Sequence, residues 1–283
     1  MRLPLALVLL LIIVTGCGAR RAPSVRIDPA LATLVPADTV LLAGVRFDAL
    51  RPTPLYRKVG PDTLGPLVGG IDLKDVWEAL AVSNGRDVAV LARGKFSPMG
   101  LEPEPAQRGA ARSSYKGYTL AGSEEATLAY LNPTTALAGR AAAVRRLIDQ
   151  RGSASGPPAA LAAEIAAIAP ETQVWIAGLG EASQAVPHRG NLGNIATALR
   201  LVERFHAAAD FRAGAQVAAT ALCRNPQDAA SLAAALQAFL AFARLTDPQS
   251  QQAAAALHIA AEERTVRIAG VLPEPVVEAL IAR

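Results

Sequence analysis

Aromatic residues are scarce in this chain of 283 residues, at 4% of the total. Much of its 52% apolar content is alanine and aliphatic side chains instead. Such a chain is too apolar to be disordered. Small side chains predict a close-packed interior and argue against large pockets walled by aromatic rings.

Lysine is also rare, with four among the 28 basic residues, and the net charge is only +4. A surplus of four charges over this length produces a weak field. Nucleic-acid binding usually needs a dense basic face, often with stacking aromatics, and the sequence has neither. The composition therefore argues against a nucleic-acid partner.

Histidines number three and are far apart, at His188, His206 and His258. A zinc site needs three or four converging ligands, so no metal is predicted. The segment 152–156 resembles a nucleophile elbow, but Ala154 stands where the serine should be. No phosphate-binding loop with its lysine occurs. The sequence predicts no catalytic residue and no cofactor.

Acidic pairs occur at Glu124-Glu125 and Glu262-Glu263, where turns or hairpin ends are expected. Glycosidases use two carboxylates across a cleft, at a separation that sequence alone does not give. Adjacent glutamates on a hairpin are usually solvated, and we interpret both pairs in this way.

The N-terminus carries a short apolar run. Arg2 precedes it, residues 3–14 form it, and Arg20 and Arg21 follow it. A membrane-spanning helix needs about 20 apolar residues, so the run is short for a span. A positive residue, an apolar stretch and then small residues are typical of a secretory signal peptide.

The end of this run resembles a bacterial lipobox, in which an aliphatic residue and two small residues precede a cysteine. Val14, Thr15, Gly16 and Cys17 fit that pattern. The resemblance implies cleavage before Cys17, which would carry a diacylglycerol thioether and an amide-linked acyl chain. Several acyl chains anchor a protein stably. The alternatives are an ordinary signal peptide with a chance cysteine and an uncleaved anchor.

The resemblance also implies a location. Lipoproteins retained at the inner membrane tend to carry Asp after the cysteine, whereas Gly18 stands here. The expected location is the cell envelope, at the outer membrane and facing the periplasm. Acylation of Cys17 would leave Cys223 without a disulfide partner. Cys223 ends an expected strand and is interpreted as a buried, inert thiol; a reactive thiol beside the following helix start is the alternative.

Two stretches of the chain are similar to each other. Residues 36–45 and 170–179 each contain a proline, an acidic residue, a threonine, a β-prone run and Ala-Gly. Residues 136–148 and 267–281 also correspond. We interpret this as an internal duplication, with chance similarity in an alanine-rich chain as the alternative. The resulting divisions are a signal peptide (1–16), a lipidated N-terminus and tether (17–35), a first α+β unit (36–151), a linker and connecting helix (152–169), and a second α+β unit (170–283).

Hydrophobic periodicity predicts strands and helices in both units. Expected strands cover 39–47, 87–96, 115–121, 127–131, 173–179, 216–222, 255–261 and 265–270. Expected helices cover 72–80, 141–151, 159–169, 192–209, 226–247 and 273–282. The predicted fold class is α+β: two tandem similar units of mostly antiparallel sheet, with helices packed on one face.

Four arginines cluster on and around the helix expected at 141–151: Arg140, Arg145, Arg146 and Arg151. Arginines in the last turns of a helix interact favourably with the helix dipole, and this interaction is the structural explanation of the cluster. The alternative is a patch for an anionic partner or a lipid headgroup.

These observations favour a lipid-anchored envelope protein that acts as a non-enzymatic interaction or scaffold module. A second hypothesis is a periplasmic carrier or binding protein for an apolar ligand or lipid, for which an apolar pocket between sheet and helices would be the decisive feature. A third is an envelope enzyme of an unrecognised type.

Globomycin, which inhibits lipoprotein signal peptidase, tests the lipobox. Treated cells are expected to accumulate uncleaved precursor, because cleavage before Cys17 is blocked, and immunoblotting would resolve the two forms. The same precursor is expected from a Cys17→Ser variant without the drug. Normal processing in both experiments would refute the lipobox.

Overall fold

Twelve antiparallel strands form one sheet in the computed structural model, which describes residues 25–58, 73–96, 111–153, 156–180, 182, 198–245 and 247–281. The strands are β1 (Leu41–Arg46), β2 (Val76–Ser83), β3 (Val88–Gly94), β4 (Arg112–Tyr115), β5 (Tyr118–Gly122), β6 (Thr127–Asn132), β7 (Thr135–Gly139), β8 (Val174–Leu179), β9 (Val202–Asp210), β10 (Ala215–Cys223), β11 (Leu257–Glu262) and β12 (Thr265–Leu272). The helices are α2 (Pro29–Ala32), α3 (Phe47–Leu50), α5 (Ala141–Gln150), α6 (Ala159–Ile165), α8 (Pro226–Ala243), α9 (Pro248–Ala256) and α10 (Glu274–Ile281).

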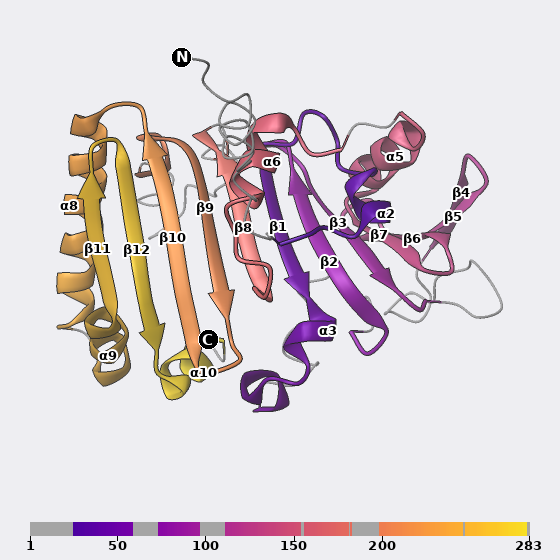
Figure 1. Cartoon of the computed structure of the whole chain (residues 1–283). Helices are drawn as coiled ribbons and strands as arrows, with labels where there is room; N and C mark the ends of the chain where they lie inside the picture. Colours follow the sequence, from indigo (N-terminus) through magenta and orange to yellow (C-terminus); the bar gives the residue numbers. More distant parts are fainter. Residues whose placement is uncertain are drawn as a thin grey trace, which may run out of the picture.

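The strand order across the sheet is β11-β12-β10-β9-β8-β1-β2-β3-β7-β6-β5-β4 (Figure 1). Strands from the two predicted units therefore lie in one continuous sheet. The units meet where β1 pairs antiparallel with β8. The predicted α+β class with an antiparallel sheet is confirmed.

Glycine and aromatic residues face each other at this junction. Gly44 of β1 is the cross-strand partner of Trp175 of β8, and a Cβ on Gly44 would lie 2.3 Å from the indole. Gly178 of β8 is likewise the cross-strand partner of Phe205 of β9, and a Cβ on Gly178 would lie 2.5 Å from the Phe205 ring. The Ala-Gly pairs that the two similar stretches share thus leave space for an aromatic ring from the next strand.

Helices pack on both faces of the sheet. Side chains of α5 and α6 join Trp175 and Ala177 in the largest apolar cluster. The helix α8 packs instead with Phe205 and Val266. Phe205 precedes His206, the cross-strand partner of Ala177, so Phe205 and Ala177 face opposite sides. The expectation of helices on one face is wrong, because both faces carry apolar residues that need cover.

Two predicted helices are strands. The segment expected as a helix at 72–80 contains the start of β2, and the end of the one expected at 192–209 lies in β9, so that His206 lies on a strand. Both strands lie between two neighbours and are packed on both faces, so their apolar residues do not alternate. Val76, Ala79 and Leu80 consequently have the spacing of a helix. Residues 192–197 lie outside the described part.

The other predicted elements are confirmed with small shifts of their ends. These are the strands that became β1, β3, β5, β6, β8, β10, β11 and β12, and the helices that became α5, α6, α8 and α10. The segment 25–35, expected to be tether, is instead folded. Val25, Leu31 and Val35 are buried in the largest apolar cluster, and the Val25 N–H donates to the Ile168 carbonyl at 2.9 Å.

A partly buried carboxyl holds this N-terminal segment. The Asp28 N–H donates to both carboxylate oxygens of Glu78 at 3.3 Å. The cross-strand partners of Glu78 are Arg46 and Arg93. Burial raises the pKa of Glu78 to about 7; the Asp28 and Asp48 carboxylates add to the rise, while the Asp28 N–H and Arg46 oppose it. Glu78 is thus an acid that titrates near neutral pH.

Gly44→Ala is expected to destabilise the protein by about 1–3 kcal/mol, because the added Cβ collides with the Trp175 indole. Urea unfolding at constant pH measures the change. In a Trp175→Phe background the smaller ring is expected to reduce the cost of the same substitution. An equal cost in both backgrounds would contradict the contact.

Glu78→Gln is expected to gain stability relative to the unsubstituted chain as pH rises. The pKa of Glu78 is about 7 in the folded chain and 4.5 in the unfolded chain. Because the unfolded chain releases this proton at lower pH, the unsubstituted protein loses stability as pH rises between these two values. The difference between the two proteins should grow by about 2–3 kcal/mol from pH 4 to pH 8. Urea unfolding at several pH values measures it, and a difference independent of pH would exclude the shift.

Candidate functional site

The helix α8 begins at a strong start signal. Asn225 accepts a hydrogen bond from the Asp228 N–H at 2.8 Å, and Pro226 occupies the first turn. Asp228 also pairs with Arg224 at 2.8 Å. From 229 to 243 the helix carries no charged residue. This apolar character on every side distinguishes α8 from the amphipathic α5, whose charged residues lie away from the sheet.

One side of α8 covers the strands of the second half. Leu232 and Ala233 are buried against Cys223 and Val266, with Leu236 partly buried beside them. Figure 1 shows α8 running alongside β11 at one end of the sheet. The contact is made largely through small side chains, because β9 and β10 are rich in alanine.

A pocket of about 180 Å³ remains between α8 and the sheet. Its described lining residues are apolar except for His206 and Thr220. The lining consists of Ala198, Leu199, Val202, Phe205, His206, Ala219, Thr220, Ala221, Leu232, Leu236, Val266 and Ile268. The side chain of His206 is engaged elsewhere, since its Nδ1 lies 2.8 Å from Oε2 of Glu164. The pocket can therefore hold a hydrocarbon group, and its described residues offer no set of polar groups for a reaction.

The outer side of α8 is apolar as well. Phe239 is 62% exposed, Phe242 65%, and Leu245, just beyond the helix, 83%. Phe239 and Phe242 are three positions apart and share one side of the helix, and Leu245 follows the helix end. Exposed large apolar groups that cluster in this way are typical of interaction surfaces.

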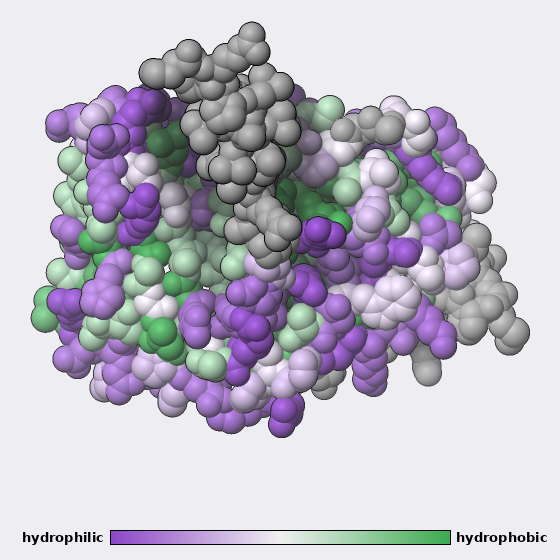
Figure 2. Space-filling view, viewed as in Figure 1, coloured by the Kyte–Doolittle hydropathy of each residue, from purple (hydrophilic) through white to green (hydrophobic). Residues whose placement is uncertain are grey.

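No helix among the described residues covers the opposite face of β10, β11 and β12 in Figure 1, and Figure 2 shows apolar patches over this half. Ala218 and Ala269 are exposed there, and Val271 is 56% exposed. Consecutive side chains on β10 point alternately toward α8, as at Ala219 and Ala221, and toward this open face, as at Ala218.

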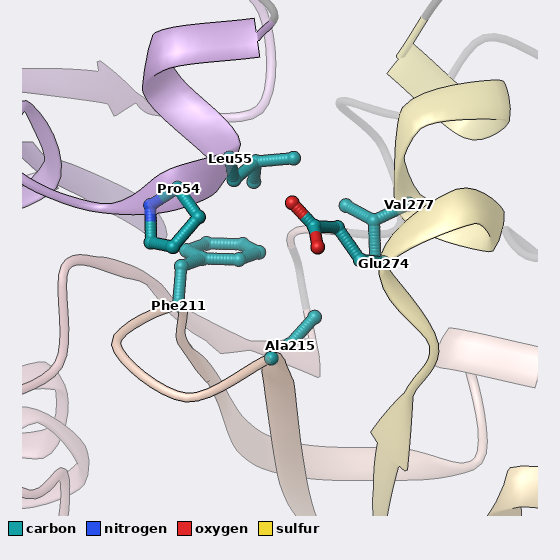
Figure 3. A pocket seen from close by; sticks show the side chains of 7 residues that line it. Pro54, Leu55, Phe211, Ala215, Glu274 and Val277 are labelled. Atoms are coloured by element: carbon teal, nitrogen blue, oxygen red, sulfur yellow. The ribbon is translucent and has the colours of Figure 1, made fainter.

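A second, much smaller pocket, of about 40 Å³, lies between the residues that follow α3, the connection from β9 to β10, and α10. Leu55, Phe211 and Val277 point into it, and the Glu274 carboxylate lies beside them (Figure 3). Lys58 binds Glu274 at 3.0 Å, which ties α10 to the first half. This pocket holds little more than a water molecule, and we interpret it as a packing gap.

The residues predicted from sequence are not brought together with the pocket beneath α8. Cys17 lies outside the described residues. The predicted arginine patch lies on the first half, where three of its members form ion pairs: Arg140 with Glu125 at 3.1 Å, Arg145 with Glu124 at 3.1 Å, and Arg146 with Asp38 at 3.3 Å. Arg151 instead lies 5.5 Å from the ring of Tyr118. The glutamates at 124 and 125 thus serve as partners of arginine.

The remaining candidates have structural surroundings. Cys223 is fully buried, as predicted, and burial raises the pKa of its thiol. His258 lies on β11, and His188 lies outside the described residues. Within the described ranges, no three His, Cys, Asp or Glu residues are placed to hold a metal ion. In the same ranges no helix is both long and apolar enough to cross a bilayer.

Sequence reasoning missed the pocket. It predicted the strands that became β10, β11 and β12 but expected β9 to be a helix, so it did not place the residues of β9 that line the pocket. A usable signal was present: the uncharged stretch 229–243 follows a strand made almost wholly of small residues. An apolar helix over an alanine-rich strand leaves space, because alanine does not reach far from the sheet.

Comparison with known proteins bears on the fold alone. No protein-family model and no curated protein matches the chain. Solved structures of TP0453 are similar in three crystal forms. Form I shares 10% identity with a TM-score of 0.53, covering 92% of this chain and 98% of that one. Form III is 11% identical in sequence, with a TM-score of 0.55, and form IV is 11% identical, with a TM-score of 0.51. Each of these two matches covers 91% of this chain and 98% of the other. Over most of its length, this chain is thus similar in fold to TP0453.

Proposed function

We propose that this chain is a lipid-anchored, non-enzymatic protein of the bacterial cell envelope that binds an apolar ligand beneath α8. The single observation that carries the ligand is the pocket of about 180 Å³ with its apolar lining. Anchoring through Cys17, at the outer membrane and facing the periplasm, rests on the signal peptide and the lipobox resemblance.

The ligand class follows from the lining. An apolar cavity excludes a charged or polar group, because desolvation of that group would not be compensated. A hydrocarbon chain has no polar group to desolvate and gains about 25 cal/mol for each Å² that it buries. The ligand is therefore an acyl chain or a similar hydrocarbon, with any polar end left outside the pocket.

A second candidate function is a protein-binding module, which the exposed side chains of Phe239, Phe242 and Leu245 favour. Apolar and aromatic residues concentrated on one surface are common at protein interfaces. The two candidates use opposite sides of α8 and can be separated by experiment.

We also propose that the chain arose by internal duplication. The order β1-β2-β3-β7-β6 corresponds to the order β8-β9-β10-β12-β11, and β1 and β8 contain the similar stretches. In this scheme the hairpin β4–β5 belongs to the first half alone, and α8 and α9 to the second. The pocket would then be a feature that only one copy acquired.

Ala219→Phe is expected to abolish ligand binding, because the larger side chain fills the pocket. Ala218→Phe is the matched control, because Ala218, which precedes Ala219 on β10, is exposed on the open side of the sheet. Fluorescence of N-phenyl-1-naphthylamine, an uncharged apolar probe, should show at least a tenfold loss of affinity for the first variant and none for the second.

Lipid analysis of the acylated protein purified from membranes provides the direct test. A stoichiometric lipid is expected with the unsubstituted chain and with Ala218→Phe, and none with Ala219→Phe. Equal lipid content in all three would refute the pocket as the site. If a partner protein co-purifies in stoichiometric amount and no lipid does, and if this partner is lost when Phe239 and Phe242 are replaced by serine, the protein-binding candidate is favoured instead.

A further inference from the structure

A groove of about 340 Å³ lies on the other face and in the other half of the molecule from the pocket beneath α8. It is bounded by α2, by the turn between β6 and β7, and by the end of α5. Leu131 of β6 belongs to the largest apolar cluster, on the face of Trp175 and opposite to Phe205. The groove is therefore separate from the proposed ligand pocket.

The floor of the groove is apolar and built on a packed core. Leu131 is 4% exposed, and Leu34 is partly buried against the same cluster. Thr135 of β7, which is 2% exposed, lies beside them. An apolar body resting here would cover leucine side chains that the fold already holds in place.

Arg151 supplies a positive charge at the groove. The other three arginines of the predicted patch are neutralised by Glu125, Glu124 and Asp38. Arg151 forms no ion pair with a carboxylate of the described residues, and its guanidinium lies 5.5 Å from the centre of the Tyr118 ring. A guanidinium is planar through its own resonance, and its in-plane N–H groups suit the two oxygens of a carboxylate or phosphate.

Asn132 adds a donor at the same place. Its Oδ1 accepts from the Thr134 N–H at 2.9 Å and from the Thr134 hydroxyl at 3.0 Å. These bonds fix the amide of Asn132, which lines the groove, and no hydrogen bond to an acceptor in the described residues engages its NH2 group. The polar groups here thus offer N–H donors and a positive charge.

We propose that this groove binds a small organic anion with an apolar body: Arg151 and Asn132 contact the carboxylate or phosphate group, and Leu34 and Leu131 contact the body. The shared chemistry of a fatty-acid carboxylate and a lipid phosphate fits this arrangement. The proposal goes beyond the apolar ligand proposed above, because it needs a charge that the pocket beneath α8 does not offer.

Isothermal titration of the full-length protein with hexyl phosphate, hexanoate and hexanol tests the inference. Both anions are expected to bind at least tenfold more tightly than the uncharged alcohol. The anion that binds with the higher affinity indicates whether the groove fits a phosphate or a carboxylate group. Hexanol binding as tightly as the anions, or inorganic phosphate binding as tightly as hexyl phosphate, would overturn the proposal.

Substitutions locate the site. Arg151→Gln is expected to weaken anion binding about tenfold or more. Arg140→Gln removes a paired arginine from the same part of the chain and should change nothing. Ala30→Trp, at an exposed position lining the groove, should block binding, whereas Ala219→Phe should leave it intact. Anion binding that survives Arg151→Gln, or that Ala219→Phe abolishes, would refute the groove while leaving the pocket beneath α8 to its own test.

Discussion

The contact between Gly44 and Trp175 holds the two halves of the chain in one sheet. Trp175 is almost fully buried, yet it comes from β8, the first strand of the second half. Its ring lies over the backbone of β1 because Gly44 has no Cβ. The indole thereby enters the core of the first half, together with Leu161 and Ile165 of α6. A larger residue at 44 would force the ring away and open that core.

The alanine content of β9 and β10 explains why the two halves differ in packing. The first half fills its faces with leucine, valine and a few rings, and two large apolar clusters result. The second half relies on alanine in β9 and β10, and its cluster under α8 is smaller. Short side chains cannot span the distance between a helix and a sheet, so space remains where Ala219 and Ala221 face Leu236. The composition that argued against an aromatic-walled pocket thus agrees with a pocket of another kind.

Local signals were enough to predict elements whose ends carry their own chemistry. The start of α8 at Asn225 and Pro226 is such an end. The sequence failed for β2 and β9, whose burial depends on neighbours on both sides and on both faces. The arginine patch shows the same limit for charge. Its neutralisation needs Asp38, which is 108 residues from Arg146, and spacing alone does not reveal such a pair.

Charge is what separates the two proposed sites. Beneath α8 a ligand meets apolar side chains, so its binding should depend little on salt and should tolerate any polar end that stays in water. At the groove a ligand meets Arg151 at the protein surface, where a single ion pair is screened by salt and worth little without further contacts. Leu34 and Leu131 supply those contacts by covering the body of the ligand. Neither the guanidinium nor the apolar floor is sufficient alone, and a ligand must therefore carry both an anion and a hydrocarbon part to be held there.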